Sequence, residues 1–332
     1  MPKGTDMIKK LQFYISHTVD PYVNLATEKI LFDTVDNETV ILYLWQNQST
    51  VVIGKNQNAF SECRTELLAK ECGTLARRLS GGGAVFHDLG NLNFTFISSA
   101  DNLDVTSNME VIRHACLLAG ITAELSGRND ILADNRKFSG NAFYNSSGRS
   151  YHHGTILINA DMQRLDRYLT PPKAKLESKG IKSVRSRVVN LSELSPSLTC
   201  DSMKGYLLSA AEAVFGISPE AIEAIDEQKL TTYTEYFSNR EFIYGSPIPF
   251  DVSCEGRLPF GSATINLCVK NGCITNIKLY TDALDHEISA VVERALTSVP
   301  FDIKTIGEAL TASLDKLTAG ALTNLLSEQI FS

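Results

Sequence analysis

The segment between residues 77 and 91 concentrates residue types that could bind an anion. Three consecutive glycines, 81–83, follow Arg77 and Arg78, and His87 and Asp88 come shortly after them. Glycine costs conformational entropy in any ordered element, so three in a row need a reason, such as a backbone that approaches a ligand closely. Backbone N–H groups can point at an anion there, and planar guanidinium groups suit phosphate or carboxylate. The pattern favours an anion or nucleotide site over a flexible loop between strands.

Two further basic features could serve the same chemistry. Lys137 lies between Arg136 and Phe138 at the start of an apolar segment. A single lysine is most often solvated, but beside a glycine loop a positive point charge is what a transferring phosphoryl group requires. Residues 173–187 hold six basic residues against one glutamate, in a chain of net charge −7. That run is either a solvated face or a basic loop facing phosphate or an acidic partner.

Several common catalytic sites are absent from the sequence. There is no phosphate-loop motif, no dinucleotide-binding glycine motif after a strand, no nucleophile elbow and no H-E-x-x-H zinc motif. The one cysteine between residues 75 and 190 is Cys116, within an expected helix, so a cysteine nucleophile is not favoured. His152 and His153 are adjacent, and neighbours on a strand face opposite ways. We therefore expect one packed histidine and no two-histidine metal site.

The composition indicates an ordinary globular protein. Of 332 residues, 43% are hydrophobic and 21% charged, and no apolar run is as long as a membrane span. The seven cysteines are odd in number and show no C-x-x-C spacing, which favours a reduced, cytoplasmic protein. The first ten residues lack the apolar segment of a signal peptide. The negative net charge argues against general nucleic-acid binding.

The hydrophobic periodicity predicts an α+β fold with a mixed or antiparallel sheet. We expect a large domain over residues 1–245, a linker at 245–249 and a small α+β domain over 250–332. Two β-rich runs at 40–45 and 50–53 predict a hairpin, and Asn271-Gly272 between two further runs is a stronger hairpin signal. The remaining expected strands are 11–16, 93–97 and 155–159. The expected helices are 24–32, 60–72, 108–119, 201–214, 231–238, 284–297, 304–316 and 319–330.

Six blocks, taken in order, resemble the lipoate–protein ligase A family of the biotin and lipoate protein ligase superfamily. The central block is the glycine segment itself, and the resemblance spans nearly the whole chain. One departure is Tyr144, where some bacterial relatives have arginine, which bears on lipoate versus octanoate preference. The blocks are residues 20–26, 77–91, 127–130, 136–140, 152–155 and 179–187.

The resemblance implies the fold of biotin–protein ligases, with a mixed-sheet catalytic domain and a small C-terminal accessory domain. It also implies an activity: lipoate and ATP, with Mg²⁺, give lipoyl-AMP and pyrophosphate, and a lysine of a lipoyl domain then takes the lipoyl group. Lys137 is the implied catalytic residue. The implied ATP contacts are Arg78, Gly83, Ala84, Val85, Phe86 and Lys137, and the implied lipoate contacts are Lys137, Gly82 and His87.

Further residues follow from the same blocks as weaker candidates. Asp130 is a candidate ligand for a Mg²⁺ held mainly by the ATP phosphates. The implied acceptors are E2 subunits of 2-oxoacid dehydrogenases and the glycine cleavage H protein. The ligase itself is expected to be a monomer. Two alternatives stay open: an octanoyl or lipoyl transferase acting from a carrier thioester or lipoyl-protein amide, and a non-catalytic lipoate- or nucleotide-binding protein. The weaker site candidates are Ser80, Asn129, Asp130, His153, Lys182 and Arg185.

Overall fold

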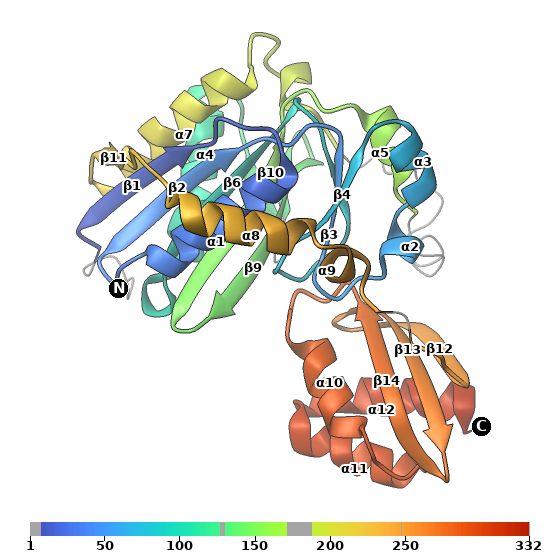
Figure 1. Cartoon of the computed structure of the whole chain (residues 1–332). Helices are drawn as coiled ribbons and strands as arrows, with labels where there is room; N and C mark the ends of the chain where they lie inside the picture. Colours follow the sequence, from blue (N-terminus) through green and yellow to red (C-terminus); the bar gives the residue numbers. More distant parts are fainter. Residues whose placement is uncertain (1–7, 127–129, 171–187, 247, 332) are drawn as a thin grey trace.

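An eight-stranded mixed sheet forms the centre of the larger part of the molecule (Figure 1). The computed structural model describes residues 8–126, 130–170, 188–246 and 248–331. The strand order is β11-β1-β2-β6-β10-β9-β8-β7, with β1 parallel to both of its neighbours and every other pairing antiparallel. This agrees with the expected mixed α+β class. The strands are β1 (Lys10–Ile15), β2 (Thr39–Trp45), β6 (Asn91–Ser99), β7 (Glu124–Ser126), β8 (Asp130–Ala133), β9 (Arg136–Ser146), β10 (Arg149–Leu157) and β11 (Pro219–Ala221).

Helices cover both faces of this sheet, which is why its central strands are apolar on both sides. Along β2, Leu42 and Leu44 pack toward α4 (Val105–Leu118) and α7 (Cys200–Phe215). The alternate residues Ile41 and Tyr43 pack toward α1 (Pro21–Thr34) and α8 (Glu227–Ser238). Figure 1 shows the two helix pairs on opposite faces. Period-2 alternation therefore divides one strand between two hydrophobic clusters.

A separate three-stranded sheet, in the order β4-β3-β5, carries the glycine segment. Its strands are β3 (Thr50–Ile53), β4 (Thr74–Arg77) and β5 (Val85–His87), so residues 78–84 form the loop between β4 and β5. We call residues 78–84 the glycine loop. Short helices flank this sheet: α2 (Ala59–Glu62), α3 (Thr65–Lys70), α5 (Met162–Tyr168) and α9 (Arg240–Tyr244).

Two local predictions are wrong here. Strands β2 and β3 do not form a hairpin but belong to different sheets, because the connection between them is held elsewhere. Asn24 donates to the carbonyl of Gln46, and the Gln48 N–H donates to Val19. The helix expected over 60–72 is two short helices, since the chain at Cys63 forms a bridge with Leu169. The first of them, α2, begins after Asn58, whose side chain accepts from the Phe60 N–H as the N-cap.

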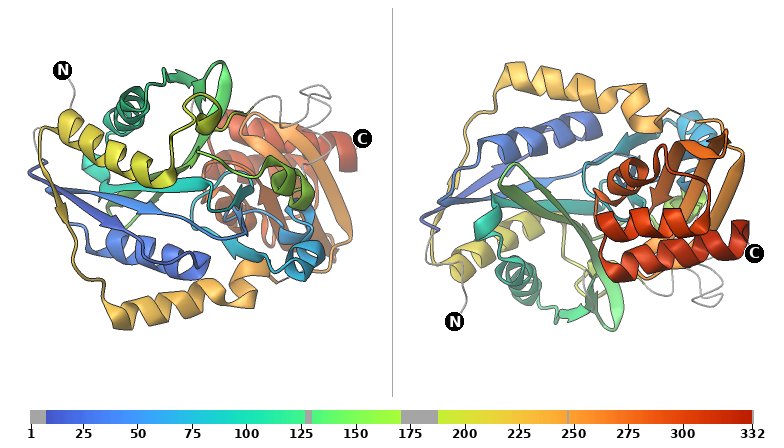
Figure 2. Two further views of the ribbon diagram at one scale, coloured as in Figure 1. Left: turned by 90° about the horizontal axis from the view of Figure 1, so that it is seen from above. Right: turned by 90° about the horizontal axis from the view of Figure 1, so that it is seen from below.

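Residues 248–331, here called the C-terminal unit, have a hydrophobic core of their own. Three antiparallel strands, β12 (Val252–Leu258), β13 (Gly261–Lys270) and β14 (Cys273–Thr281), lie against α10 (Ile288–Leu296), α11 (Ile303–Ser313) and α12 (Lys316–Ile330) (Figure 2). Asn271 and Gly272 join β13 to β14 with positive φ at both residues, as the hairpin prediction requires. This core is distinct from the two clusters that flank the eight-stranded sheet. No helix within the described ranges is long and apolar enough to cross a membrane.

Candidate active site

A cavity of about 600 Å³ lies between the glycine loop, strands β9 and β10, and the C-terminal unit. We call it the central cavity. It collects residues that are far apart in the sequence, and the turn between β12 and β13 forms part of its wall. Nine of the sequence-predicted site residues line it: Arg78, Gly82, Gly83, Ala84, Val85, His87, Asp130, Lys137 and His153.

The other predicted residues are placed differently. Ser80 and Phe86 are buried, at 0% and 3% exposure, and do not line the central cavity. Asn129, Lys182 and Arg185 lie outside the described residues, as does the basic run at 173–187.

Lys137 is the second residue of β9 and lines the central cavity. It lies beside an irregularity in the pairing of β9 with β8. Its Nζ lies 2.6 Å from Oδ1 of Asp130, and both side chains are about one-third exposed. Gly140 adjoins it closely, since a Cβ at this position would be 2.9 Å from Nζ. A fixed, partly solvated ammonium group therefore faces the cavity, with one carboxylate to hold it and no side chain at Gly140 to displace it.

The glycine loop packs against the C-terminal unit. The Gly82 N–H donates to the carbonyl of Ala283 at 2.8 Å, and Gly82 has φ +91°. A Cβ at Gly81 would overlap the carbonyl oxygens of Ala283 and Leu284. The loop thus needs glycine for one left-handed residue and one close backbone approach. In this arrangement the close approach is to protein, rather than to a ligand as the sequence alone suggests.

Arg78 holds the glycine loop in shape while lining the central cavity. Its guanidinium donates to the carbonyls of Gly81 and Gly83 at 2.8 Å each, and to the Ser80 hydroxyl at 3.0 Å. Burial lowers its pKa to about 10, well above neutrality, so it stays charged. The residue therefore provides both the loop geometry and a positive potential at the cavity wall.

Arg77 does not serve the anion site, contrary to what we expect from the sequence. Adjacent strand residues face opposite ways, and Arg77 points away from the central cavity, into a shell of backbone carbonyls. It donates to the carbonyls of residues 54, 55 and 57 on one side and of Phe242 and Ile243 on the other, at 2.6–3.1 Å. Its role is to join the end of β4 to α9.

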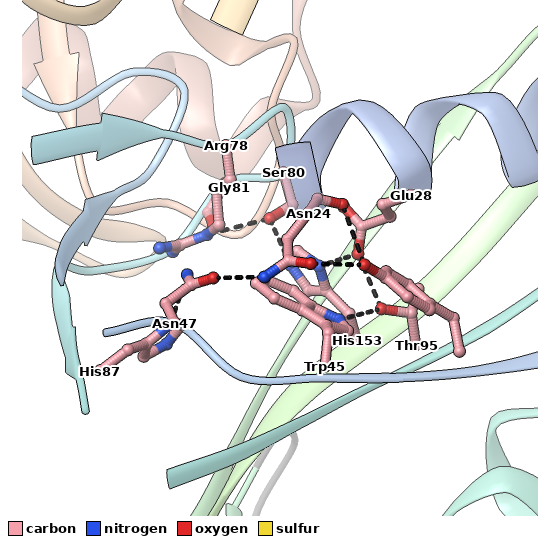
Figure 3. Close-up of polar contacts among 11 residues, drawn as sticks. Asn24, Glu28, Trp45, Asn47, Arg78, Ser80, Gly81, His87, Thr95 and His153 are labelled. Atoms are coloured by element: carbon pink, nitrogen blue, oxygen red, sulfur yellow. Dashed lines mark hydrogen bonds and ion pairs between the residues drawn. The ribbon is translucent and has the colours of Figure 1, made fainter. Parts of the chain in front are cut away.

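A buried polar chain connects the glycine loop to helix α1 (Figure 3). The Ser80 hydroxyl lies 2.8 Å from Nε2 of His153, and Nδ1 of His153 lies 2.9 Å from Glu28 Oε1. Thr95 donates to the same carboxylate oxygen at 2.7 Å. With Nδ1 protonated, His153 donates to Glu28 and accepts from Ser80, whose oxygen accepts from Arg78. The chain thereby links a buried guanidinium to a buried carboxylate through Ser80 and His153.

The two adjacent histidines behave as their strand alternation predicts. His153 lines the central cavity, whereas His152 is fully buried on the opposite side, stacked on Phe143. Burial lowers the pKa of His152 to about 3. The same cause lowers the pKa of His87 to about 3, where the ring lies edge-on to Trp45 and 3.2 Å from the Asn47 amide. Both rings are neutral at physiological pH.

Tyr144 lies away from the central cavity. Its ring packs on His286 of the C-terminal unit at a centroid distance of 4.6 Å, and on Phe32 at 5.3 Å. Tyr144 is not one of the described residues that line the cavity. The departure from the family pattern therefore falls at the contact between the two units.

The sequence reasoning missed several site residues. Glu28 lies within the helix expected over residues 24–32, where no site residue is predicted. Arg257 and Asp282 come from the C-terminal unit, where no chemistry is expected from the sequence. The available signal for Glu28 was a carboxylate between apolar residues such as Leu25 and Ile30 of the expected helix. The cavity-lining residues missed are Leu25, Trp45, Val52, Asn93, Gly140, Asn141, Ala142, Gly154, Thr155, Arg257, Pro259, Phe260, Gly261, Asp282 and Leu284.

Comparison with known proteins gives consistent matches over both parts of the chain. Residues 20–212 match the family model described as the lipoyl protein ligase A/B catalytic domain, and residues 248–327 match the bacterial lipoate protein ligase C-terminus. The lipoate-protein ligase A of Bdellovibrio bacteriovorus is 37% identical over 322 residues, which is 94% of each chain.

Two solved structures are also similar. LipL1 of P. falciparum, in complex with lipoate, aligns with a TM-score of 0.84 at 28% identity and covers 96% of this chain and 99% of its own. The bipartite lipoate protein ligase of Thermoplasma acidophilum, described with its E2 lipoyl domain, aligns with a TM-score of 0.62 at 25% identity. That match covers 74% of this chain and 100% of the other.

Proposed function

Because this chain belongs to the lipoate–protein ligase A family, we infer that it is an ATP-dependent ligase that attaches free lipoate to a lysine of a lipoyl domain. The central cavity carries the inference, since it brings the glycine loop, Arg78 and Lys137 together around one space. An amide does not form readily from a free carboxylate in water, so the carboxylate is first activated as an adenylate.

In the first half-reaction, a lipoate carboxylate oxygen attacks the α-phosphorus of ATP, and pyrophosphate leaves. Two anions must approach each other, so positive groups fixed in advance have to offset their repulsion. Lys137 is placed to bind the carboxylate and to stabilise charge that develops on the α-phosphate. The carboxylate is already ionised at neutral pH, so this step needs no general base.

The apolar part of the central cavity suits the rest of lipoate. Leu25, Trp45 and Val52 give it an apolar wall, which matches an aliphatic chain that ends in a dithiolane ring. His87 and His153 adjoin this wall. We propose that the lipoate tail lies along it while its carboxylate reaches Lys137.

In the second half-reaction, the ε-amine of the acceptor lysine attacks the acyl carbonyl of lipoyl-AMP. The new bond is an amide, and AMP leaves. The adenylate is prone to hydrolysis, so a cavity closed by the C-terminal unit would protect it from water. We propose that residues 250–332 act as an accessory domain of this kind beside a catalytic domain over 1–245.

Mg²⁺ fits the residues present as a companion of the nucleotide. The ion takes few protein ligands and usually keeps phosphate oxygens and water in its shell. The described residues form no cluster of three or more metal-binding side chains, and Asp130 supplies a carboxylate at the cavity wall. We propose Asp130 as a ligand there. When bound, Mg²⁺ would neutralise phosphate charge.

The competing transferase chemistry would proceed through a cysteine acyl-enzyme. None of the cysteines lines the described wall of the central cavity. Burial raises the pKa of Cys116 to about 12 and that of Cys63 and Cys200 to about 11, so these thiols are not nucleophilic at neutral pH. Both observations favour the ligase.

The acceptor belongs to the class of lipoyl domains. We propose E2 subunits of 2-oxoacid dehydrogenases and the glycine cleavage H protein as the specific acceptors, modified by a monomer in the cytoplasm. The E2 lipoyl domain described with the Thermoplasma acidophilum ligase supports the first of these.

Incubation with ATP, lipoate and an apo lipoyl domain, followed by intact mass measurement, tests the function. We expect one lipoyl group per domain, with no product when ATP is omitted. An octanoyl-carrier thioester without ATP should give no transfer. Transfer from that thioester alone would replace the ligase with the transferase.

A further inference from the structure

The C-terminal unit supplies a charged side chain to the central cavity. Arg257, at the end of β12, and Asp282, just after β14, both line it. Arg257 Nη1 lies 3.3 Å from Asp282 Oδ1 and donates to the Ser262 hydroxyl at 2.9 Å. The Arg257 side chain is 39% exposed and that of Asp282 only 7%. A basic group thus rests on a buried acid in the part of the cavity wall that the C-terminal unit provides.

The support beneath Arg257 is fixed by backbone geometry. The Ser262 N–H donates to Asp282 Oδ1 at 2.7 Å. Gly261 makes room for the carboxylate, because a Cβ there would lie 2.6 Å from the same oxygen. Asp282 is therefore positioned before any ligand binds, and it sets the position of the guanidinium in turn.

The orientation of Arg257 leaves part of its guanidinium for a ligand. Its hydrogen bonds within the described part of the chain all use Nη1. The planar fork suits two oxygens of one phosphate. The cavity's other basic groups are occupied differently, since Arg78 is bonded to loop carbonyls and Lys137 is paired with Asp130.

We propose that Arg257 binds the pyrophosphate portion of ATP and stabilises it as the leaving group. This proposal rests on the proposed function. A triphosphate carries more charge than Lys137 alone offsets, and Arg257 is the remaining partly exposed base on the described cavity wall. Once pyrophosphate has left, Arg257 has no further ligand, so its action is confined to the first half-reaction.

The test separates the two half-reactions in the full-length chain. Lipoate-dependent exchange of pyrophosphate into ATP reports the first, and transfer from pre-formed lipoyl-AMP to an apo lipoyl domain reports the second. For Arg257→Gln we expect the KM for ATP in exchange to rise about tenfold or more, as loss of a charged hydrogen bond implies, with transfer unchanged. Arg257→Lys should recover part of the loss.

Arg294→Gln is the matched control, because Arg294 is exposed on α10 and does not line the central cavity. It should exchange as wild type does. An unchanged KM for ATP in Arg257→Gln would overturn the proposal, and so would an equal loss in both half-reactions. Absence of exchange in the wild-type protein would instead overturn the proposed function.

Discussion

Lys137 and Asp130 form an ion pair at the wall of the central cavity, with 2.6 Å between Nζ and Oδ1. The carboxylate holds the lysine at the cavity when no anion is bound. A bound carboxylate or phosphate would then share the ammonium group with Asp130. Only the part of this interaction that strengthens in the transition state raises the rate.

Lys137→Met keeps an unbranched apolar stem and removes the charge, so we expect a folded protein with impaired adenylation. By analogy with oxyanion-hole donors, loss of one such charge costs about 3–4 kcal/mol, or roughly 10²–10³ in rate. Lys137→Arg should also be poor, since a planar fork does not fit a point-charge site. Pyrophosphate exchange measures the effect, and exposed Lys70→Met is the control. Near-wild-type exchange in folded Lys137→Met would transfer the role to Arg78.

Gly140→Ala should impair the same step without unfolding the protein. The new Cβ would lie 2.9 Å from Lys137 Nζ, and the flexible end of the lysine can move aside. We therefore expect exchange to fall at least tenfold, by analogy with misplaced catalytic groups, and the melting temperature to change little.

Gly205→Ala provides the matched control for Gly140→Ala. Gly205 lies within α7 with open space around its Cα, so alanine should stabilise the helix by about 0.5–1 kcal/mol and leave activity unchanged. If Gly140→Ala exchanges as well as this control does, the position of the Lys137 ammonium is not critical.

Arg77→Lys should destabilise the protein rather than weaken ATP binding. A lysine cannot reach the carbonyls of residues 54–57 and of α9 at once, so buried acceptors are left without donors. We expect a loss of about 3 kcal/mol in the free energy of unfolding, measured with urea. Arg64→Lys, at an exposed arginine, should change it by less than about 0.5 kcal/mol. A raised KM for ATP with unchanged stability would place Arg77 in the active site after all.

Stability should fall as the pH drops below about 6.5. The pKa of His87 and of His152 is lowered from 6.5 to about 3 by burial, so both stay neutral in the folded state while the unfolded chain takes up protons. The unfolded state then binds more protons, and stability decreases with falling pH. Between pH 7 and pH 5 each histidine contributes a loss of about 2 kcal/mol.

Urea unfolding of variants at several pH values checks this pH dependence. His152→Gln should reduce the loss of stability between pH 7 and pH 5 by about 2 kcal/mol, which is the contribution of one histidine. Parallel curves for His152→Gln and wild type would show that His152 does not titrate differently in the two states.

Gly81→Ala tests the contact between the glycine loop and the C-terminal unit. The added Cβ would overlap two backbone carbonyls, of Ala283 and Leu284, and backbone cannot move aside as a side-chain end can. We expect the C-terminal unit to separate and chymotrypsin to cleave after Tyr244 or Phe250 several-fold faster, as mass spectrometry would show. Unchanged cleavage at these sites would contradict the contact, and cleavage only within residues 1–240 would contradict the proposed boundary.

Local signals predicted much of the fold because they depend on neighbouring residues. Asn271-Gly272 specifies its own turn, and Gly120, with φ +76°, ends α4 where the helical period stops. The pairing of β2 and β3 was mispredicted because both strands are buried along their whole length. The sequence therefore held no alternation of apolar and polar residues that would choose between partners. Their sheets are decided by contacts with distant strands.

The same contrast between local signals and contacts of distant segments applies to the candidate site. The glycine loop and Lys137 stand out as local blocks. Glu28 acquires its role only because β10 brings His153 beside α1, 125 residues away in the sequence. Arg77 and Arg78 look equivalent in the sequence, although strand alternation at the end of β4 was a signal that could have separated them.

The carbonyl shell around Arg77 also bears on how the chain is made. Phe242 and Ile243 lie 165 and 166 residues beyond the arginine, so they leave the ribosome long after it. Domains generally fold as units during synthesis, the N-terminal one first. Until α9 emerges, this guanidinium has carbonyl partners on one side alone. A nascent chain that stops near residue 212, where the catalytic family match ends, would still await the segment that completes its packing.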